Sequence, residues 1–193
     1  MDTKTRLIRT MQQSLARQGF HGIGLAELLT KAETVKGAMY HHFPGGKTEL
    51  AQAAIEATVA GLVQSLESSL NKSEDLVANL RYWLNGAGAF LSFSGFESGC
   101  PLATIALETT TKDVALRTAL AKGFATIRAA LATELTAHGI DPDRANSIAA
   151  VMVSTYEGGL MQARVSQDMS SLEAGNSLLL DWLSGELIKW RSK

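Results

Sequence analysis

The sequence of 193 residues contains one cysteine, Cys100, and three prolines. A single cysteine allows no intrachain disulfide and excludes a zinc site made of several cysteines. The scarcity of proline, together with many alanines and leucines, favours long helices. No apolar run reaches the roughly 18 residues of a membrane span, and the first residues show no apolar stretch of the signal-peptide type. We therefore expect a soluble, helical protein of the cytoplasm that does not enter a membrane.

The formal net charge of −1 is unevenly distributed along the chain. Residues 1–50 hold seven Lys and Arg against four acidic residues, a net charge of +3, which leaves eleven against fifteen, or −4, for residues 51–193. A basic N-terminal part on an acidic remainder indicates an anionic partner for that part. An ordinary solvated surface explains the same charges equally well.

Apolar residues recur at intervals of three and four along most of the chain, the period of a helix buried on one side. Gly19 and Gly139 are placed to end helices, and Asp141 followed by Pro142 is a start signal. No alternating run rich in Val, Ile and Tyr appears, so we predict an all-α fold without strands. The predicted helices, about nine, cover residues 3–18, 25–31, 35–41, 47–70, 75–93, 102–109, 113–138, 142–165 and 171–190.

The second and third predicted helices are short, are separated by a tight break and follow a longer helix, which is the helix-turn-helix arrangement. The second short helix of such a motif enters a DNA major groove about 12 Å wide. We expect Val35 and Met39 to point inward and the remaining positions to be available for DNA. These positions are Lys36, Gly37, Ala38, Tyr40 and His41, of which Gly37 and Ala38 are small enough for close backbone approach.

Residues 25–50, LAELLTKAETVKGAMYHHFPGGKTEL, resemble the TetR family of bacterial transcriptional repressors. The resemblance implies a homodimer that binds double-stranded operator DNA through residues 1–47, with effector binding and dimerisation in residues 48–193. It places Tyr40 and Lys47 on backbone phosphates, and Lys36 and His41 near bases or phosphates. The family often has Gly-Val-Ser where this chain has Glu33, Thr34 and Val35. Thr34 is then expected to cap the third helix one residue early, with an altered entry geometry.

A second resemblance concerns the body of the chain. Residues 99–103, Gly-Cys-Pro-Leu-Ala, followed by Ala-Leu-Glu at 106–108 and by EGGLMQAR at 157–164, resemble the LmrA/YxaF-type branch of the family. Regulators of this branch control multidrug-efflux or small-aromatic catabolic genes. The resemblance implies a repressor that is released from DNA by a small molecule.

Aromatic residues of the later helices and the glycine-rich loop are candidates for an apolar effector chamber. Aromatic residues at helical spacing are as often plain core residues, and that alternative is equally open. We expect a small effector that is mainly apolar or aromatic. The candidate lining residues are Trp83, Phe90, Phe93, Phe96, Phe124 and Tyr156, with Arg128 or Tyr156 as the polar contact.

The last two helices are candidates for the dimer interface. Two adjacent glycines inside a helix cost about 1 kcal/mol each relative to alanine, for which close helix approach would compensate. The last helix carries apolar residues on more than one face, as a helix with a partner in a second subunit does. The candidate interface residues are Gly158, Gly159, Leu179, Trp182 and Leu183.

The other classes of function find little in the sequence. No nucleophile elbow, phosphate loop or zinc-protease motif is present, so we expect neither an enzyme nor a cofactor. Cys100 is more simply a packing residue than a redox sensor, and the histidines lack metal-ligand spacing. A helical adaptor that binds only proteins is the alternative, although it leaves Tyr40 and Lys47 in the basic N-terminal part unexplained.

Overall fold

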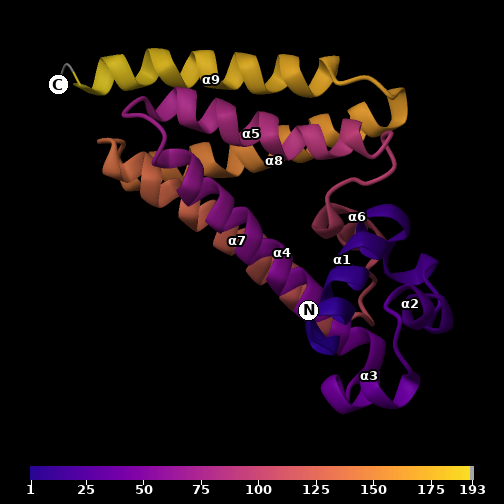
Figure 1. Ribbon diagram of the computed structural model, residues 1–193. Helices are drawn as coiled ribbons and strands as arrows, with labels where there is room; N and C mark the ends of the chain where they lie inside the picture. Colours follow the sequence, from indigo (N-terminus) through magenta and orange to yellow (C-terminus); the bar gives the residue numbers. More distant parts are fainter. Residues whose placement is uncertain (192–193) are drawn as a thin grey trace. The chain divides into compact units, whose positions relative to one another are not determined.

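The computed structural model describes residues 1–191 and, for side chains, residues 1–189. Within residues 1–191 it contains nine helices and no strand, which confirms the all-α prediction (Figure 1). The helices are α1 (Thr3–Gly22), α2 (Leu25–Lys31), α3 (Lys36–His42), α4 (Gly46–Leu70), α5 (Leu76–Phe93), α6 (Pro101–Glu108), α7 (Val114–Ala137), α8 (Pro142–Ser166) and α9 (Ser170–Arg191). None of the described helices is long and apolar enough to span a membrane.

The chain forms two compact units. The first unit, residues 1–60 and 98–124, contains α1, α2, α3, α6 and parts of α4 and α7. The second unit, residues 61–97 and 125 onward, contains α5, α8, α9 and the remaining parts of α4 and α7. The first unit thus combines the N-terminal helices with the later segment 98–124. The division into a DNA-binding part and an effector-binding part at residue 47 stays a prediction.

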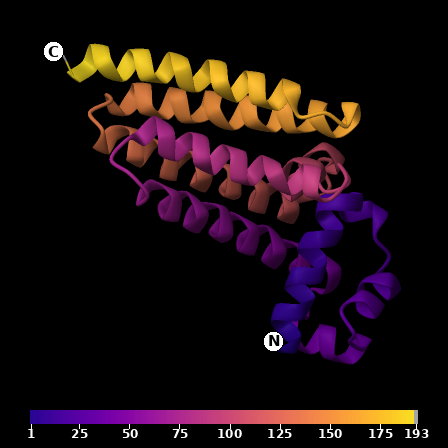
Figure 2. The ribbon, with the colours of Figure 1, turned by 45° about the horizontal axis from the view of Figure 1, so that its top comes forward.

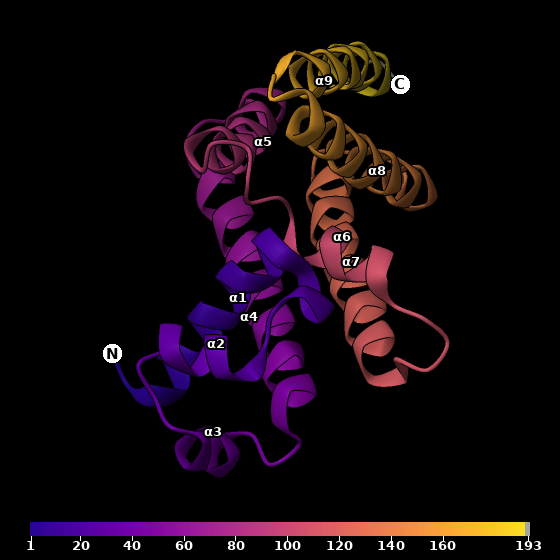
Figure 3. The ribbon, with the colours of Figure 1, turned by 90° about the vertical axis from the view of Figure 1, so that its right-hand side faces the viewer.

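The first unit has a core built from the apolar faces of its helices. Leu7, Met11 and Leu15 of α1 are fully buried, as their spacing predicts, and so are Leu28 of α2 and Met39 of α3. The helices α1 and α6 pack against each other, and α1 also contacts α2 and α3 (Figure 3). The core therefore fixes the short helices α2 and α3 to the long α1.

The end of α1 differs from the prediction. Gly19 has a positive φ of 74°, which is the backbone freedom expected of a glycine there. The helical structure resumes after this kink and continues to Gly22 rather than ending at residue 18. Gly19 therefore kinks α1 instead of terminating it.

The turn between α2 and α3 also differs. Val35 is 70% exposed and is the N-cap of α3, because the helix begins at Lys36, so the prediction that Val35 points inward is wrong. No side chain caps α3, so the expected cap by Thr34 is wrong as well. Glu33, at the position where the family often has glycine, adopts a positive φ of 47°.

The second unit is built from α5, α8 and α9, which lie side by side with the ends of α4 and α7 (Figure 2). Its helix boundaries follow local signals in the sequence. Asp141 accepts hydrogen bonds from the N–H groups of Asp143 and Arg144, with Pro142 as the first helical residue. Gly139 follows α7 with a φ of 91°. Both predictions are confirmed.

Candidate nucleic-acid interface

The outer face of α3 carries most of the residues expected to contact DNA. Lys36, Gly37, Tyr40 and His41 are exposed, Ala38 is half-buried, and Met39 is fully buried beneath them. Added side-chain atoms at Gly37 would meet nothing within 4 Å, so the backbone there is open to a partner. The Lys36 ammonium lies 5.9 Å from the centroid of the Tyr40 ring. The face thus combines a cation, a phenol and exposed backbone, which are groups suited to phosphates and base edges.

Arg6 of α1 braces the turn that precedes α3. Its Nε donates to the Ala32 carbonyl oxygen at 2.8 Å, and its Nη2 donates to the Glu33 carbonyl oxygen at 3.4 Å. These two bonds hold the turn in which Glu33 has its positive φ. Sequence reasoning missed Arg6, because its partners lie 26 and 27 residues away and no local pattern announces them.

Lys47, expected on a phosphate, is engaged inside the first unit. Its Nζ donates to the Phe20 carbonyl oxygen and lies 4.4 Å from the centroid of the Phe20 ring. Burial lowers the pKa of Lys47 below its ordinary value, and the nearby charge of Glu108 partly opposes this shift. In this arrangement Lys47 links the start of α4 to the end of α1, and its role as a phosphate contact stays a prediction.

Glu108 of α6 binds the same segment from another side. Its Oε2 accepts the backbone N–H of Phe20 at 2.7 Å and that of His21 at 3.1 Å. A side chain at position 19 would collide with the Glu108 carboxylate, so Gly19 is required by space as well as by its φ. The sequence marks Glu108 only as part of a resemblance, and its contact with α1 was not expected.

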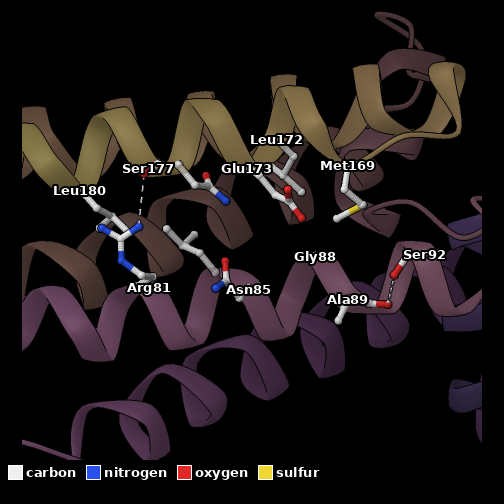
Figure 4. A pocket seen from close by; sticks show the side chains of 12 residues that line it. Arg81, Asn85, Gly88, Ala89, Ser92, Met169, Leu172, Glu173, Ser177 and Leu180 are labelled. Atoms are coloured by element: carbon white, nitrogen blue, oxygen red, sulfur yellow. Dashed lines mark hydrogen bonds between the residues drawn. The ribbon is translucent and has the colours of Figure 1, made fainter.

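The candidate effector residues differ widely in how far they are buried. Trp83 is buried, and its Nε1 has no hydrogen-bond partner among the described residues. Phe90 and Phe93 are 65% and 96% exposed. The half-buried candidates are Phe96, Phe124, Arg128 and Tyr156, of which Phe124 belongs to the first unit. None of these seven residues lines the cavity of about 450 Å³ that lies between α5 and α9 (Figure 4).

The candidate dimer residues divide into two groups. Gly159, Leu179 and Leu183 are buried within the second unit, where a Cβ at Gly159 would lie 2.9 Å from the Leu172 Cα. The close approach expected at the two glycines thus occurs at Gly159, between α8 and α9 of one chain. Gly158 has open space where a Cβ would be, and Trp182 is 40% exposed.

An apolar surface extends beyond these two residues. On α8, Val151, Met161 and Val165 are exposed at intervals that place them on the face of Gly158. On α9, Leu178 is exposed one turn before Trp182. We name these six residues the outer α8–α9 face. Its five large side chains are exposed, and Arg144 of α8 lies 5.4 Å from the centroid of the Trp182 ring. Exposed apolar residues gathered on one face usually mark a site that binds a partner.

The fold and the exposed α3 face define a helix-turn-helix regulator that binds DNA. Two family models match: the model for bacterial regulatory proteins of the tetR family over residues 8–54, and that for the C-terminal domain of LmrA/YxaF-like transcriptional regulators over residues 77–176. The chain therefore belongs to the TetR family, in its LmrA/YxaF-like branch. It is a DNA-binding transcriptional regulator and not an enzyme.

Similar proteins extend over most of the chain. The uncharacterized HTH-type transcriptional regulator YxaF of Bacillus subtilis is 28% identical over 89% of this chain and 90% of its own. The HTH-type transcriptional repressor NemR of Escherichia coli is 29% identical over 89% of both chains. A cysteine mutant of the TetR family regulator CifR, solved with double-strand operator DNA, has a TM-score of 0.77 at 21% identity and covers 94% of this chain and 96% of its own.

Proposed function

We propose that this protein is a homodimeric repressor that binds operator DNA through α3 and leaves it when a small, mainly apolar molecule binds. Residues 1–47 would contact DNA, and residues 48–193 would dimerise and bind the effector. The exposed face of Lys36, Gly37, Tyr40 and His41 is the observation that carries the proposal. The name of NemR, a repressor, supports the direction of regulation. A regulator of chromosomal operators would act in the cytoplasm.

DNA binding is tested with the DNA upstream of the protein's own gene, because such regulators often control neighbouring genes. A fluorescence-anisotropy titration at two salt concentrations, with a shuffled sequence of the same length as control, measures specificity and salt dependence. We expect preference for the upstream DNA and an affinity that falls steeply with salt, as released counterions require. Equal and weak binding to both DNAs would favour the protein-binding adaptor.

The outer α8–α9 face supports the homodimer. A two-fold axis through such a face makes each apolar residue meet the same surface of the partner, so the whole patch is buried at once. A dimer would also present two α3 helices to two half-sites of an operator. Sedimentation equilibrium at micromolar concentration tests this, and a monomer at that concentration would contradict it.

The proposed release from DNA requires that effector binding and DNA binding influence each other. A ligand shifts a regulator between two states only by its difference in affinity for them, typically roughly 1–3 kcal/mol. We expect an inducer to lower operator affinity by about 5- to 150-fold. Aromatic and apolar compounds that raise the melting temperature are then tested for DNA release. A compound that stabilises the protein and leaves operator affinity unchanged is not an inducer, and Phe96→Ala and Tyr156→Ala test the aromatic residues expected to contact one.

A further inference from the structure

Val35, the residue before α3, has an exposed hydrocarbon side chain. It is 70% exposed, and its carbonyl oxygen accepts the Met39 N–H at 3.2 Å, which joins it to the first turn of the helix. No other exposed side chain of residues 35–41 is entirely hydrocarbon, because Met39 is buried and Ala38 is half-buried. A single exposed valine on an ordinary surface needs no explanation. The place of Val35, beside the face proposed to contact DNA, gives it one.

The turn between α2 and α3 holds Val35 in this outward position. The Thr34 N–H donates to the Leu29 carbonyl oxygen at 3.0 Å, and Arg6 of α1 donates to the carbonyl oxygens of residues 32 and 33. Val35 itself has an extended backbone, with φ −106° and ψ 155°. Because α1 and α2 already fix the turn, the Val35 side chain can meet a partner without the cost of ordering a loop.

The surface next to Val35 is open to the major groove. Helix α3 lies at an edge of the first unit (Figure 3), Lys36 is exposed, and a Cβ at Gly37 would meet nothing within 4 Å. The backbone of the first turn can therefore come close to base edges, which brings a short side chain within their reach. In helix-turn-helix proteins the base contacts come from the first residues of the second helix.

One group in the major groove suits an isopropyl side chain. Base pairs present hydrogen-bond donors and acceptors there, and thymine adds a C5-methyl group. Valine placed against a donor or acceptor would remove its water and offer no bond in return, whereas valine against the methyl buries apolar surface on both sides. We propose that Val35 contacts a thymine C5-methyl in the operator and is a specificity-determining residue. The proposal rests on the proposed DNA binding through α3 and adds the chemical group that is recognised.

The chemistry of position 35 agrees with an apolar contact. The serine that is frequent at this position in the family can cap a helix or donate a hydrogen bond to a phosphate. Val35 can do neither, and no side chain caps α3. An exposed hydrocarbon at this position is suited to an apolar group of the DNA and not to its backbone.

Uracil in place of thymine tests the contact directly, because uracil pairs in the same way and lacks only the C5-methyl group. The operator is first obtained by selecting duplexes that the wild-type protein binds from a random pool. Each thymine of the selected sequence is then replaced singly, and anisotropy titrations measure the affinity for each duplex. We expect uracil at one position of a half-site to weaken wild-type binding about fourfold, the effect of taking one methyl-sized group out of an apolar contact.

Variants of Val35 separate this contact from an effect of uracil on DNA shape. Val35→Ala and Val35→Ser both lack the γ-methyl groups, so each should bind the thymine and uracil duplexes equally at that position. Val114→Ala is the matched control, because Val114 is a 66% exposed valine at the start of α7 in the same unit. It should keep the fourfold difference. Circular dichroism checks that all three variants are folded.

The outcomes distinguish this assignment from the proposed function. A difference between thymine and uracil that vanishes in the Val35 variants and persists in Val114→Ala supports the assignment. A selected operator in which no thymine responds to uracil, or a response that persists in Val35→Ala, overturns it while specific DNA binding stands. If the wild-type protein selects no sequence, the proposed function fails and the assignment fails with it.

Discussion

The Glu108 carboxylate and the Phe20 backbone N–H are joined by a hydrogen bond of 2.7 Å, which ties α6 to the kinked end of α1. Lys47 binds the carbonyl oxygen of the same residue from the start of α4. Both backbone groups of Phe20 are therefore held by charged side chains from distant parts of the first unit. Charge-assisted bonds are about twice as strong as neutral ones, so this small region should matter for stability.

The first prediction concerns Glu108. Glu108→Ala removes the acceptor of two backbone N–H groups and should lower the free energy of unfolding by about 1.5–3 kcal/mol. Glu108→Gln keeps an acceptor oxygen without the charge and should fall between this variant and the wild type. Urea unfolding followed by circular dichroism measures both. Glu56→Ala, at an exposed position of α4, is the control and should stay within about 0.5 kcal/mol of the wild type.

The second prediction couples Gly19 to Glu108. Gly19→Ala is strained by the φ of 74° and by collision with the carboxylate, so it should destabilise by more than about 1 kcal/mol. In the Glu108→Ala background the collision is gone and only the backbone strain is left. The double-mutant cycle should therefore show a coupling of at least about 0.5 kcal/mol. Gly61→Ala, in open space on α4 without a positive φ, should instead stabilise slightly; strict additivity at 19 and 108 would contradict this account.

Whether a structural feature could be predicted from the sequence depends on how many residues separate the groups that form it. The boundaries at Gly139 and Asp141 were readable because helix ends are marked by residues within a few positions of them. The exposed α3 face was readable because its inner partner Met39 follows helical spacing. The contact of Glu108 with Phe20 spans 88 residues, and nothing local signals it.

The sequence also did not reveal which helices pack against each other. A close helix approach was expected at both glycines of α8, and it occurs at Gly159 alone, with a helix that the sequence did not identify. Gly159 meets Leu172 of the same chain, whereas Gly158 faces open space. Likewise, the α5–α9 cavity depends on how two helices about 90 residues apart are spaced, which no periodicity encodes.

The third prediction concerns the α3 face. Lys36→Ala should weaken binding to all DNA sequences and lower the slope of log affinity against log salt by about one unit, as loss of one phosphate contact does. Tyr40→Phe removes a neutral hydroxyl, so it should weaken binding without changing the slope. Anisotropy titrations on operator and shuffled DNA measure both effects. Lys189→Ala, at an exposed position of α9, removes the same charge and is the control. If Lys189→Ala changed the slope as much as Lys36→Ala does, Lys36 would not be a specific phosphate contact.

The fourth prediction concerns pH and Lys47. Burial lowers the pKa of Lys47 in the folded state below its ordinary value of 10.5, so the unfolded chain binds this proton more tightly. Stability then rises with pH as the solution passes from the lowered pKa toward 10.5, and this increment is absent below both values. Lys47→Met keeps the hydrocarbon contact with Phe20 and should lack the increment. Urea midpoints from neutral to alkaline pH, compared between the two proteins, check this; parallel curves would contradict it.

The fifth prediction separates the outer α8–α9 face from the core beneath it. Trp182→Glu and Gly158→Leu should yield folded monomers that no longer bind operator DNA, because both positions face outward. Leu183→Ala is the contrasting variant: it lies fully inside the subunit and should cost about 2–5 kcal/mol of folding stability. Sedimentation and circular dichroism distinguish the two results. Wild-type behaviour of both outward variants in sedimentation would exclude this face as the interface.

The last prediction concerns the unsatisfied oxygen of Asn176. Asn176 lines the cavity between α5 and α9, and its Oδ1 is buried with no hydrogen-bond partner among the described residues, so the folded state carries a desolvation cost that the unfolded chain avoids. Asn176→Leu fills a similar volume without a polar atom and should raise the free energy of unfolding by about 1–2 kcal/mol. Asn85→Leu, at an exposed position across the same cavity, should change it by less than about 0.5 kcal/mol. Urea unfolding measures both variants. A lower free energy of unfolding for Asn176→Leu than for the wild type would mean that the amide oxygen is hydrogen-bonded in solution, and would contradict this prediction.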